Sequence, residues 1–267
     1  MPPDTAAERT SIHPQWAEML ARWAIPDDLV AVAPTSPYFF DPAVFIDAAD
    51  EAIGRPDDTV SDRTAREALP PGGTVLDVGV GAGAASLRLG ATRVIGVDPS
   101  RVLLAAFVER AARLGIAPTP IEGTWPTVAP DVGLADVVVC HHVVYNVADL
   151  AGFATALAAH ARDRVVLELT AEHPMAWMRP YWEALHGLDQ PDRPTVDDAI
   201  AVLGELGFNV RQQRWRRRYQ MIGENGDDQV ARVGRRLCLP TPRYDELHQL
   251  LTTIPPPRER EVVTVWW

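Results

Sequence analysis

A glycine-dense segment, residues 74–88, constrains this chain more than any other feature of its sequence. A β-forming run at residues 75–78 meets a turn that contains Gly79, Gly81 and Gly83. Glycine tolerates positive φ and lets a ligand approach the backbone without a Cβ in the way. A helix-compatible stretch follows, and the first N–H groups of a helix are free to face a ligand. The segment therefore predicts a strand, a loop and a helix that hold a small, nucleotide-like molecule.

A second signal is an acid at the end of the next β-branched run, residues 93–98. Asp98 lies about twenty residues after the glycine turn, where an acid binds ribose hydroxyls in nucleotide-binding folds. The sequence Asp98-Pro99-Ser100 also suits the start of a helix, so a capping role is the structural alternative. We favour the ribose contact because of the spacing.

Two more strands follow in order. Residues 120–126 predict a third strand that runs into a turn with Thr124 and Trp125. Residues 135–150 predict a buried apolar strand that ends in a polar cluster with two adjacent histidines. Four ordered signals are far more specific than a single glycine motif.

In this order the four segments resemble class I S-adenosylmethionine-dependent methyltransferases over about residues 70–170. Asp77-Val-Gly79-Val-Gly81-Ala-Gly83 matches the D/E-x-G-x-G-x-G loop of that family. Gly79-x-Gly81-x-x-Ala84 also fits the dinucleotide fingerprint G-x-G-x-x-G/A. Charge separates the two interpretations, because a carboxylate at Asp77 repels a pyrophosphate and attracts the sulfonium and ammonium of S-adenosylmethionine. Asp77 therefore favours S-adenosylmethionine as the cofactor.

The resemblance implies which residues contact the cofactor. They are the four loop residues Asp77, Gly79, Gly81 and Gly83, then Asp98 and Pro99 at the ribose, Thr124 and Trp125 beside the adenine, and Cys140 and His141 after the fourth strand. In the family an acid usually follows the third strand, whereas here Glu122 stands slightly early. The ring of Trp125 either faces the adenine or packs beneath the loop.

Methyl transfer from a sulfonium has a good leaving group, so positioning of the nucleophile supplies much of the catalysis. A base is needed only if the acceptor carries a proton in its ground state. We predict His142 and His173 as acid–base candidates, with a structural hydrogen bond as the alternative for each. Adjacent strand residues point to opposite faces, so we expect His141 and His142 not to serve one site. No metal site is expected. Further candidate groups are Tyr145, Glu168 and Glu172.

The alternation of strands and helices predicts an α/β fold with a doubly wound, mostly parallel sheet and right-handed crossovers. The resemblance implies seven strands with the last one antiparallel. We expect an N-terminal helical segment over residues 1–70 and a methyltransferase domain over residues 71–267, with a helical insertion at about 170–194. Both additions carry aromatic residues, which predicts a substrate lid; packing of these helices on the core is the alternative.

Local signals predict helices at residues 12–25, 42–53 and 61–69, with Asp41 as the N-cap of the second. Proline and aromatic residues at 31–41 predict an irregular loop.

Composition limits the functional classes. The chain has 267 residues, a formal net charge of −11 and two distant cysteines. The acidic balance disfavours nucleic-acid binding, and the cysteines do not form a disulfide framework. We find no apolar stretch of membrane-spanning length and no leader, and so expect a cytoplasmic protein without a membrane partner; a homodimer stays open. The basic run at residues 211–218 suits either RNA or, as we prefer, an arginine-guarded edge strand.

The sequence thus predicts methyl transfer from S-adenosylmethionine to an O, N or C nucleophile of a small molecule. One alternative is an NAD(P)-dependent oxidoreductase, based on the dinucleotide fingerprint. Another is a non-catalytic protein that binds S-adenosylmethionine or associates with RNA through residues 211–218.

Overall fold

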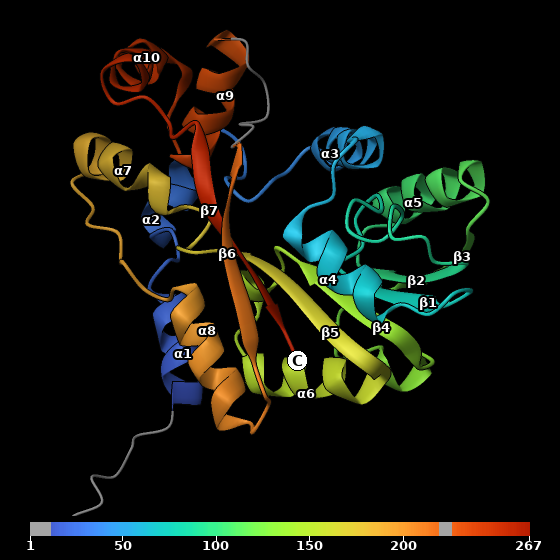
Figure 1. The fold of residues 1–267 in the computed structure, drawn as a ribbon. Coiled ribbons are helices and arrows are strands. Elements are labelled where there is room, and N and C mark those ends of the chain that lie inside the picture. The colour runs from blue at the N-terminus through green and yellow to red at the C-terminus, as the bar shows by residue number, and fades with distance from the viewer. Residues whose placement is uncertain (1–11, 219–225) are drawn as a thin grey trace, which may run out of the picture.

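The computed structural model describes residues 12–218 and 226–267. Seven strands form one sheet in the order β3-β2-β1-β4-β5-β7-β6 (Figure 1). Strand β7 is antiparallel to both of its neighbours, and the other strands run parallel to one another. This topology confirms the predicted doubly wound sheet with an antiparallel last strand. The strands are β1 Thr74–Val78, β2 Arg93–Asp98, β3 Ala117–Glu122, β4 Ala135–His141, β5 Ala161–Thr170, β6 Arg211–Arg218 and β7 Glu259–Trp266.

Helices cover both faces of the sheet. The bounds are α1 Ile12–Ala21, α2 Asp27–Val32, α3 Pro42–Gly54, α4 Val60–Ala68, α5 Arg101–Arg113, α6 Leu150–His160, α7 Arg179–His186, α8 Val196–Glu205, α9 Gly226–Arg236 and α10 Tyr244–Thr253. Alternate residues of the central strands enter two different cores: Leu76 packs with α1, α6 and α8, and Val75 packs with α4 and α5. Burial on both faces explains why these strands are almost continuously apolar.

A third apolar cluster forms a helical cap beyond the sheet. It joins α7, α9 and α10, and residues of the α2 region pack against it (Figure 1). Tyr181 and Trp182 are buried inside this cap, so these two aromatics of the predicted insertion pack it together rather than line an open mouth. The cap therefore combines segments from both ends of the chain. The division into residues 1–70 and 71–267 stays a prediction, and residues 1–11 lie outside the described residues.

Two local predictions need correction in the N-terminal segment. The first helix ends at Ala21, before the expected residue 25, and a second helix, α2, occupies part of the region predicted as loop. Trp23 explains the early end, because its indole N–H donates to the Arg193 carbonyl at 2.8 Å and its ring stacks on His173. The helix predicted at residues 42–53 is confirmed as α3, with Asp41 accepting from the Ala43 amide.

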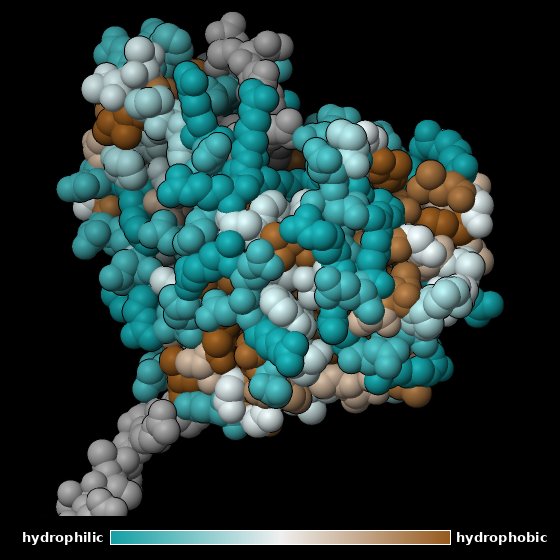
Figure 2. All heavy atoms as spheres, viewed as in Figure 1, coloured by the Kyte–Doolittle hydropathy of each residue, from teal (hydrophilic) through white to brown (hydrophobic). Residues whose placement is uncertain are grey.

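The basic run at residues 211–218 forms β6, an edge strand. The surface over β6 is hydrophilic in the view of Figure 2. The predicted edge-strand placement is therefore confirmed. Arg214 pairs with Asp197 and Glu261, at 2.5 and 3.2 Å, and Arg217 reaches Glu168 at 3.3 Å. In the part of the chain that the structure describes, no helix has the length and apolar character to cross a lipid bilayer.

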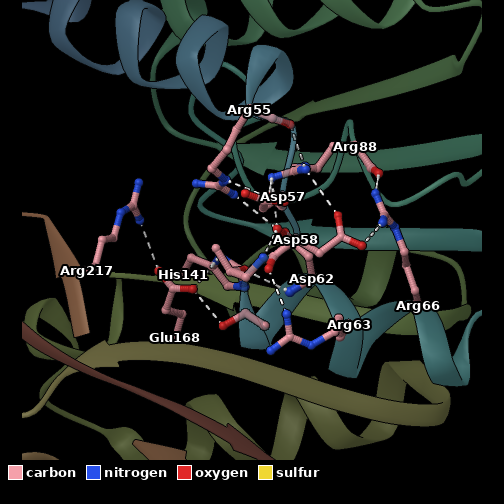
Figure 3. A network of polar contacts seen from close by, with 12 residues as sticks. Arg55, Asp57, Asp58, Asp62, Arg63, Arg66, Arg88, His141, Glu168 and Arg217 are labelled. Atoms are coloured by element: carbon pink, nitrogen blue, oxygen red, sulfur yellow. Dashed lines mark hydrogen bonds and ion pairs between the residues drawn. The ribbon is translucent and has the colours of Figure 1, made fainter. Parts of the chain in front are cut away.

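An ion-pair network fixes the start of α4 (Figure 3). Thr59 and Asp62 form a reciprocal capping box. The Asp62 carboxylate also pairs with Arg55 and Arg88, each at 3.1 Å, and Asp58 pairs with Arg88 at 3.1 Å. The side chains of Asp62 and Arg88 are only 3% and 7% exposed, so their charges depend on each other. The network ties the segment after the glycine turn to α4.

The Asp62 carboxylate gives a first prediction. Asp62→Ala removes the cap and leaves two guanidinium groups without this partner, so we expect it to lower the free energy of unfolding by about 3 kcal/mol. Glu109→Ala breaks an exposed pair with Arg113 on α5 and serves as the control, with an expected loss of at most about 0.5 kcal/mol. Urea denaturation monitored by circular dichroism measures both values. Equal losses in the two variants would contradict a stabilising network.

Candidate active site

The carboxyl ends of the parallel strands meet at one edge of the sheet. Asp77 of β1 is in register with Gly96 of β2 and Val139 of β4, and His141 of β4 is in register with Glu168 of β5. Ligands of open α/β sheets bind at this edge. The register therefore brings predicted residues from separate strands to the same edge.

The glycine turn after β1 has a left-handed backbone. Gly79 has φ +79°, and a Cβ there would lie 2.4 Å from Val143 Cγ2. Gly81 has φ +52°, but a Cβ there would enter open space. Only glycine fits at position 79 without a clash, whereas open space for a ligand lies next to Gly81.

The helix predicted after this turn is absent from the described segment; residues 81–89 form consecutive turns. Gly83 has φ +97°, which no helix accepts, and Gly90 at φ +84° ends the segment. The six residues between them are too few to stabilise a helix on their own. The prediction of a helix N-terminus facing the ligand was therefore wrong.

Asp98 joins the end of β2 to the open part of the turn. Its carboxylate accepts from the Gly81 amide at 2.9 Å and from the Ser100 amide at 2.8 Å. Ser100, not Asp98, is the N-cap of α5, because its hydroxyl accepts from the Leu103 amide. The Asp98 oxygens keep further lone pairs for ribose hydroxyls.

Asp77 is a fully buried carboxylate with the Ser86 hydroxyl beside it. It has no exposed surface, and neither of its oxygens makes a hydrogen bond in the described structure. Burial raises the pKa of Asp77 to about 7; the nearby Ser86 hydroxyl lowers it in part, and the charge of Asp98 raises it further. Such an unsatisfied group is costly unless a ligand supplies its partner.

A polar cluster centred on Glu168 lies at the ends of β4 and β5. The Ser61 hydroxyl donates to Glu168 Oε2 at 2.6 Å. His142 Nε2 lies 3.0 Å from Oε1. Arg217 Nη1 lies 3.3 Å from Oε1, and His141 Nδ1 lies 3.9 Å from Oε2 (Figure 3). Burial alone would raise the pKa of Glu168, but the charges of the two histidines and Arg217 hold it well below its usual range. Glu168 is therefore an anion in this cluster.

The two adjacent histidines do not point to opposite faces, so that expectation was wrong. Strand β4 ends at His141, and His142 has φ +59°, which turns its side chain back toward Glu168. The His142 amide donates to the Glu168 carbonyl at 2.8 Å and holds this turn. Burial lowers the pKa of His141, so its ring is neutral near pH 7.

Sequence reasoning missed Ser61 and Arg217. Ser61 is in the first turn of α4 and Arg217 is on β6, far from Glu168 in sequence. A serine next to a capping box and an arginine in a basic run are ordinary surface patterns, so the sequence carried no signal for either contact.

The remaining predicted cofactor residues occupy different environments. Thr124 and Pro99 are exposed near the strand ends. Trp125 is buried in the core, with its ring edge-on to His160 at 4.8 Å, as in the packing alternative. The Cys140 side chain is fully buried in the same core. Their cofactor contacts stay predictions.

His173, the other predicted acid–base residue, lies in a separate aromatic cluster. Its ring stacks on Trp23 at 3.9 Å and meets Tyr145 edge-on at 5.3 Å. The Met175 amide donates to its Nδ1 at 3.3 Å. Burial, with the charges of Arg179 and Arg236, lowers the pKa of His173 to about 3. The imidazole is therefore neutral near pH 7.

A family model described as a methyltransferase domain matches residues 49–213. The chain belongs to this methyltransferase family. The match confirms the predicted relationship to class I S-adenosylmethionine-dependent methyltransferases and decides between the two interpretations of the glycine turn. Comparison with curated proteins gives no match.

Solved structures share the fold of this methyltransferase. The YcgJ protein from Bacillus subtilis is 16% identical, with a TM-score of 0.53, and the alignment covers 81% of this chain and 97% of that chain. A putative methyltransferase from Bacillus halodurans is 14% identical, with a TM-score of 0.55 and coverage of 77% and 95%. At these identities the likeness concerns the fold.

S-adenosylmethionine is the cofactor of this methyltransferase family, and two observations test the fit. The space over Gly81 lies beside the Asp98 carboxylate, as a ribose requires. The unsatisfied carboxylate of Asp77 suits a positively charged ligand. The residues present therefore fit the cofactor. Within residues 12–218 and 226–267, no group of three or more acidic, histidine or cysteine side chains is arranged to hold a metal ion.

The raised pKa of Asp77 gives a second prediction. Only the ionised carboxylate attracts the cofactor, so the affinity for S-adenosylmethionine should rise by about tenfold between pH 6 and pH 8. Asp77→Asn should bind more weakly at pH 8 and remove this part of the pH dependence. Isothermal titration calorimetry measures the affinity of both proteins at each pH. Because the ligand itself titrates equally in both experiments, comparing wild type with the variant removes its contribution.

The same substitution should stabilise the ligand-free protein. A carboxyl whose pKa is raised by folding contributes stability below about pH 4, and this contribution is lost as the pH rises to about 7. Asp77→Asn should therefore raise the melting temperature at pH 8 relative to wild type. The free energy of unfolding should rise by about 2 kcal/mol. A lower melting temperature at pH 8 would contradict the burial of an unsatisfied carboxylate.

Proposed function

We propose that this methyltransferase transfers a methyl group to an O, N or C nucleophile of a small molecule, with His142 as the group that removes a proton from the acceptor. The observation that carries the proposal is the pair formed by His142 and Glu168, 3.0 Å apart at the end of β4. This pair stands at the same sheet edge as the glycine turn, and ligands of open α/β sheets bind at this edge. Substitution of His142 tests the proposal, because it should reduce methyl transfer and leave cofactor binding intact.

The charge pattern supports a small acceptor rather than RNA. The chain carries a net charge of −11. Two arginines of β6 are engaged by acids: Arg214 by Asp197 and Glu261, and Arg217 by Glu168. An RNA-binding surface needs a continuous excess of available positive charge.

When bound, S-adenosylmethionine supplies a methyl group on a sulfonium, which is a reactive electrophile. The protein contributes binding through Asp98, which accepts from hydroxyl groups, and through Asp77, which attracts positive charge. Glu168, held by Ser61 and Arg217, keeps the Nε2 side of the His142 ring toward itself. A neutral imidazole with its N–H toward a carboxylate presents Nδ1 as the proton acceptor.

The proton would therefore move from the acceptor to His142 Nδ1 as the nucleophile forms its bond to the methyl carbon, while the carbon–sulfur bond breaks and S-adenosylhomocysteine leaves. The resulting imidazolium is stabilised by the Glu168 carboxylate at 3.0 Å. This arrangement is that of a base oriented by a third group, and such bases contribute about 10²–10⁴ in rate. Orientation of the nucleophile supplies the rest.

Asp98 provides the prediction for cofactor binding. Asp98→Ala removes the carboxylate that bridges Gly81 and the ribose position, so we expect S-adenosylhomocysteine binding to weaken by at least tenfold. Calorimetry measures the dissociation constant. Asp131→Ala, outside the sheet edge on the 3₁₀ turn after β3, is the control and should bind as wild type. No detectable binding by wild type would reject the cofactor assignment.

His142 provides the prediction for catalysis. His142→Gln should lower methyl transfer by about 100-fold while S-adenosylhomocysteine binding changes by less than about twofold. The assay incubates purified protein with methyl-labelled S-adenosylmethionine and a metabolite extract and follows labelled products by mass spectrometry. Full activity in His142→Gln would mean that positioning alone drives the reaction.

A further inference from the structure

A cavity of about 560 Å³ lies where the end of β5 meets the cap. Its walls come from residues 170–174, 176, 177 and 180, from residues 254, 255 and 257 of the linker before β7, and from the start of β7. Neither Asp77, Asp98 nor Gly81 lines it, so it is distinct from the cofactor site. Its volume suits a small molecule. It begins at Thr170, two residues after Glu168 on the same strand, which is about 7 Å along a β-strand.

The cavity wall is largely apolar. Trp177, Ile254 and four prolines contribute to it. The acidic side chains are Glu172, Glu259 and Glu261, against a single arginine, Arg260. A molecule with a carboxylate or phosphate would meet mainly like charge here. Glu261 and Glu259 are already paired with Arg214 and Arg216, at 3.2 and 3.9 Å, so these two acids do not need a cation from a ligand. An uncharged molecule therefore fits the largely apolar wall best.

His173 is held in one orientation at this wall. One face of its ring stacks on Trp23, and Nδ1 accepts the Met175 amide hydrogen. Because Nδ1 is an acceptor, the proton of the neutral ring is on Nε2. His173 lines the cavity, and the bond at Nδ1 leaves Nε2–H as the donor of the ring. His173 is therefore a fixed hydrogen-bond donor and not a base.

We propose that this cavity binds the methyl acceptor, an uncharged and largely apolar small molecule, and that His173 Nε2–H donates a hydrogen bond to an oxygen of it. The inference rests on the proposed function and adds to it the substrate class and a binding residue. His173 binds one part of the acceptor while His142, at the adjoining strand end, takes the proton from the reacting atom. The two histidines thus have different roles.

Two substitutions of His173 separate a donor from a base. His173→Gln carries an amide N–H near the position of Nε2. His173→Asn keeps an acceptor for the Met175 amide, but its shorter side chain places no N–H near the position of Nε2. With methyl-labelled S-adenosylmethionine and a metabolite extract, His173→Gln should keep product formation within about threefold, and His173→Asn should lower it by at least tenfold. Equal effects of the two substitutions would overturn the donor role.

A second pair of variants tests the cavity without touching His173. Ile254 lines the cavity and is 38% exposed, so Ile254→Trp narrows the cavity from a position where the fold tolerates a larger side chain. Leu114→Trp, at a 45% exposed position at the end of α5, is the matched control. Ile254→Trp should lower labelled product by at least tenfold, and Leu114→Trp should leave it unchanged. An unchanged product profile in Ile254→Trp would overturn the acceptor site.

Calorimetry with S-adenosylhomocysteine accompanies all four variants. Each should bind as wild type, because none of the substituted residues lines the cofactor site. Failure of wild type to bind would reject the proposed function, whereas normal binding with unaltered products in Ile254→Trp and His173→Asn would reject the acceptor cavity alone. The two failures are thus distinguishable.

Discussion

The parallel pairing of β2, β1, β4 and β5 is the constraint on which the rest of the structure depends. Parallel strands end at the same edge of a sheet, so a residue at the end of one strand meets its counterpart on the next. Asp77 is level with Val139, and His141 is level with Glu168. Helix α4 runs over this sheet with its first turn at the same edge, which brings Ser61 to Glu168. Any shift in register would separate these groups.

Two buried carboxylates at this edge show how partners decide the behaviour of a charge. Asp77 and Glu168 are almost equally buried, yet burial raises the pKa of Asp77 whereas neighbouring cations lower that of Glu168. Glu168 has a hydroxyl, an arginine and two histidines around it, and it belongs to the protein's own network. Asp77 has the Ser86 hydroxyl beside it but no cation among the described residues that shift its pKa, which leaves it available to a cationic ligand.

The cap links the ends of the chain to the site. Trp23 from the N-terminal segment stacks on His173, and its N–H bonds to Arg193 beyond α7. Ile254, from the linker before β7, reaches the same cavity and accepts the Tyr181 hydroxyl through its carbonyl. The acceptor cavity that we propose is therefore built by segments that are far apart in sequence. This arrangement explains why each aromatic residue of the cap looked like ordinary core packing when considered alone.

The sequence by itself determined the sheet, the glycine turn and the acid at the end of β2, because hydrophobic period, glycine spacing and strand-end acids are local properties. It did not determine the segment after Gly83, where positive φ excluded a helix, or the direction of His142, where a left-handed residue ended the strand alternation. Only the tertiary structure decided that Ser61 and Arg217 surround Glu168 and that Nδ1 of His173 accepts a hydrogen bond from the Met175 amide. Those outcomes depend on contacts between distant elements, which no local pattern encodes.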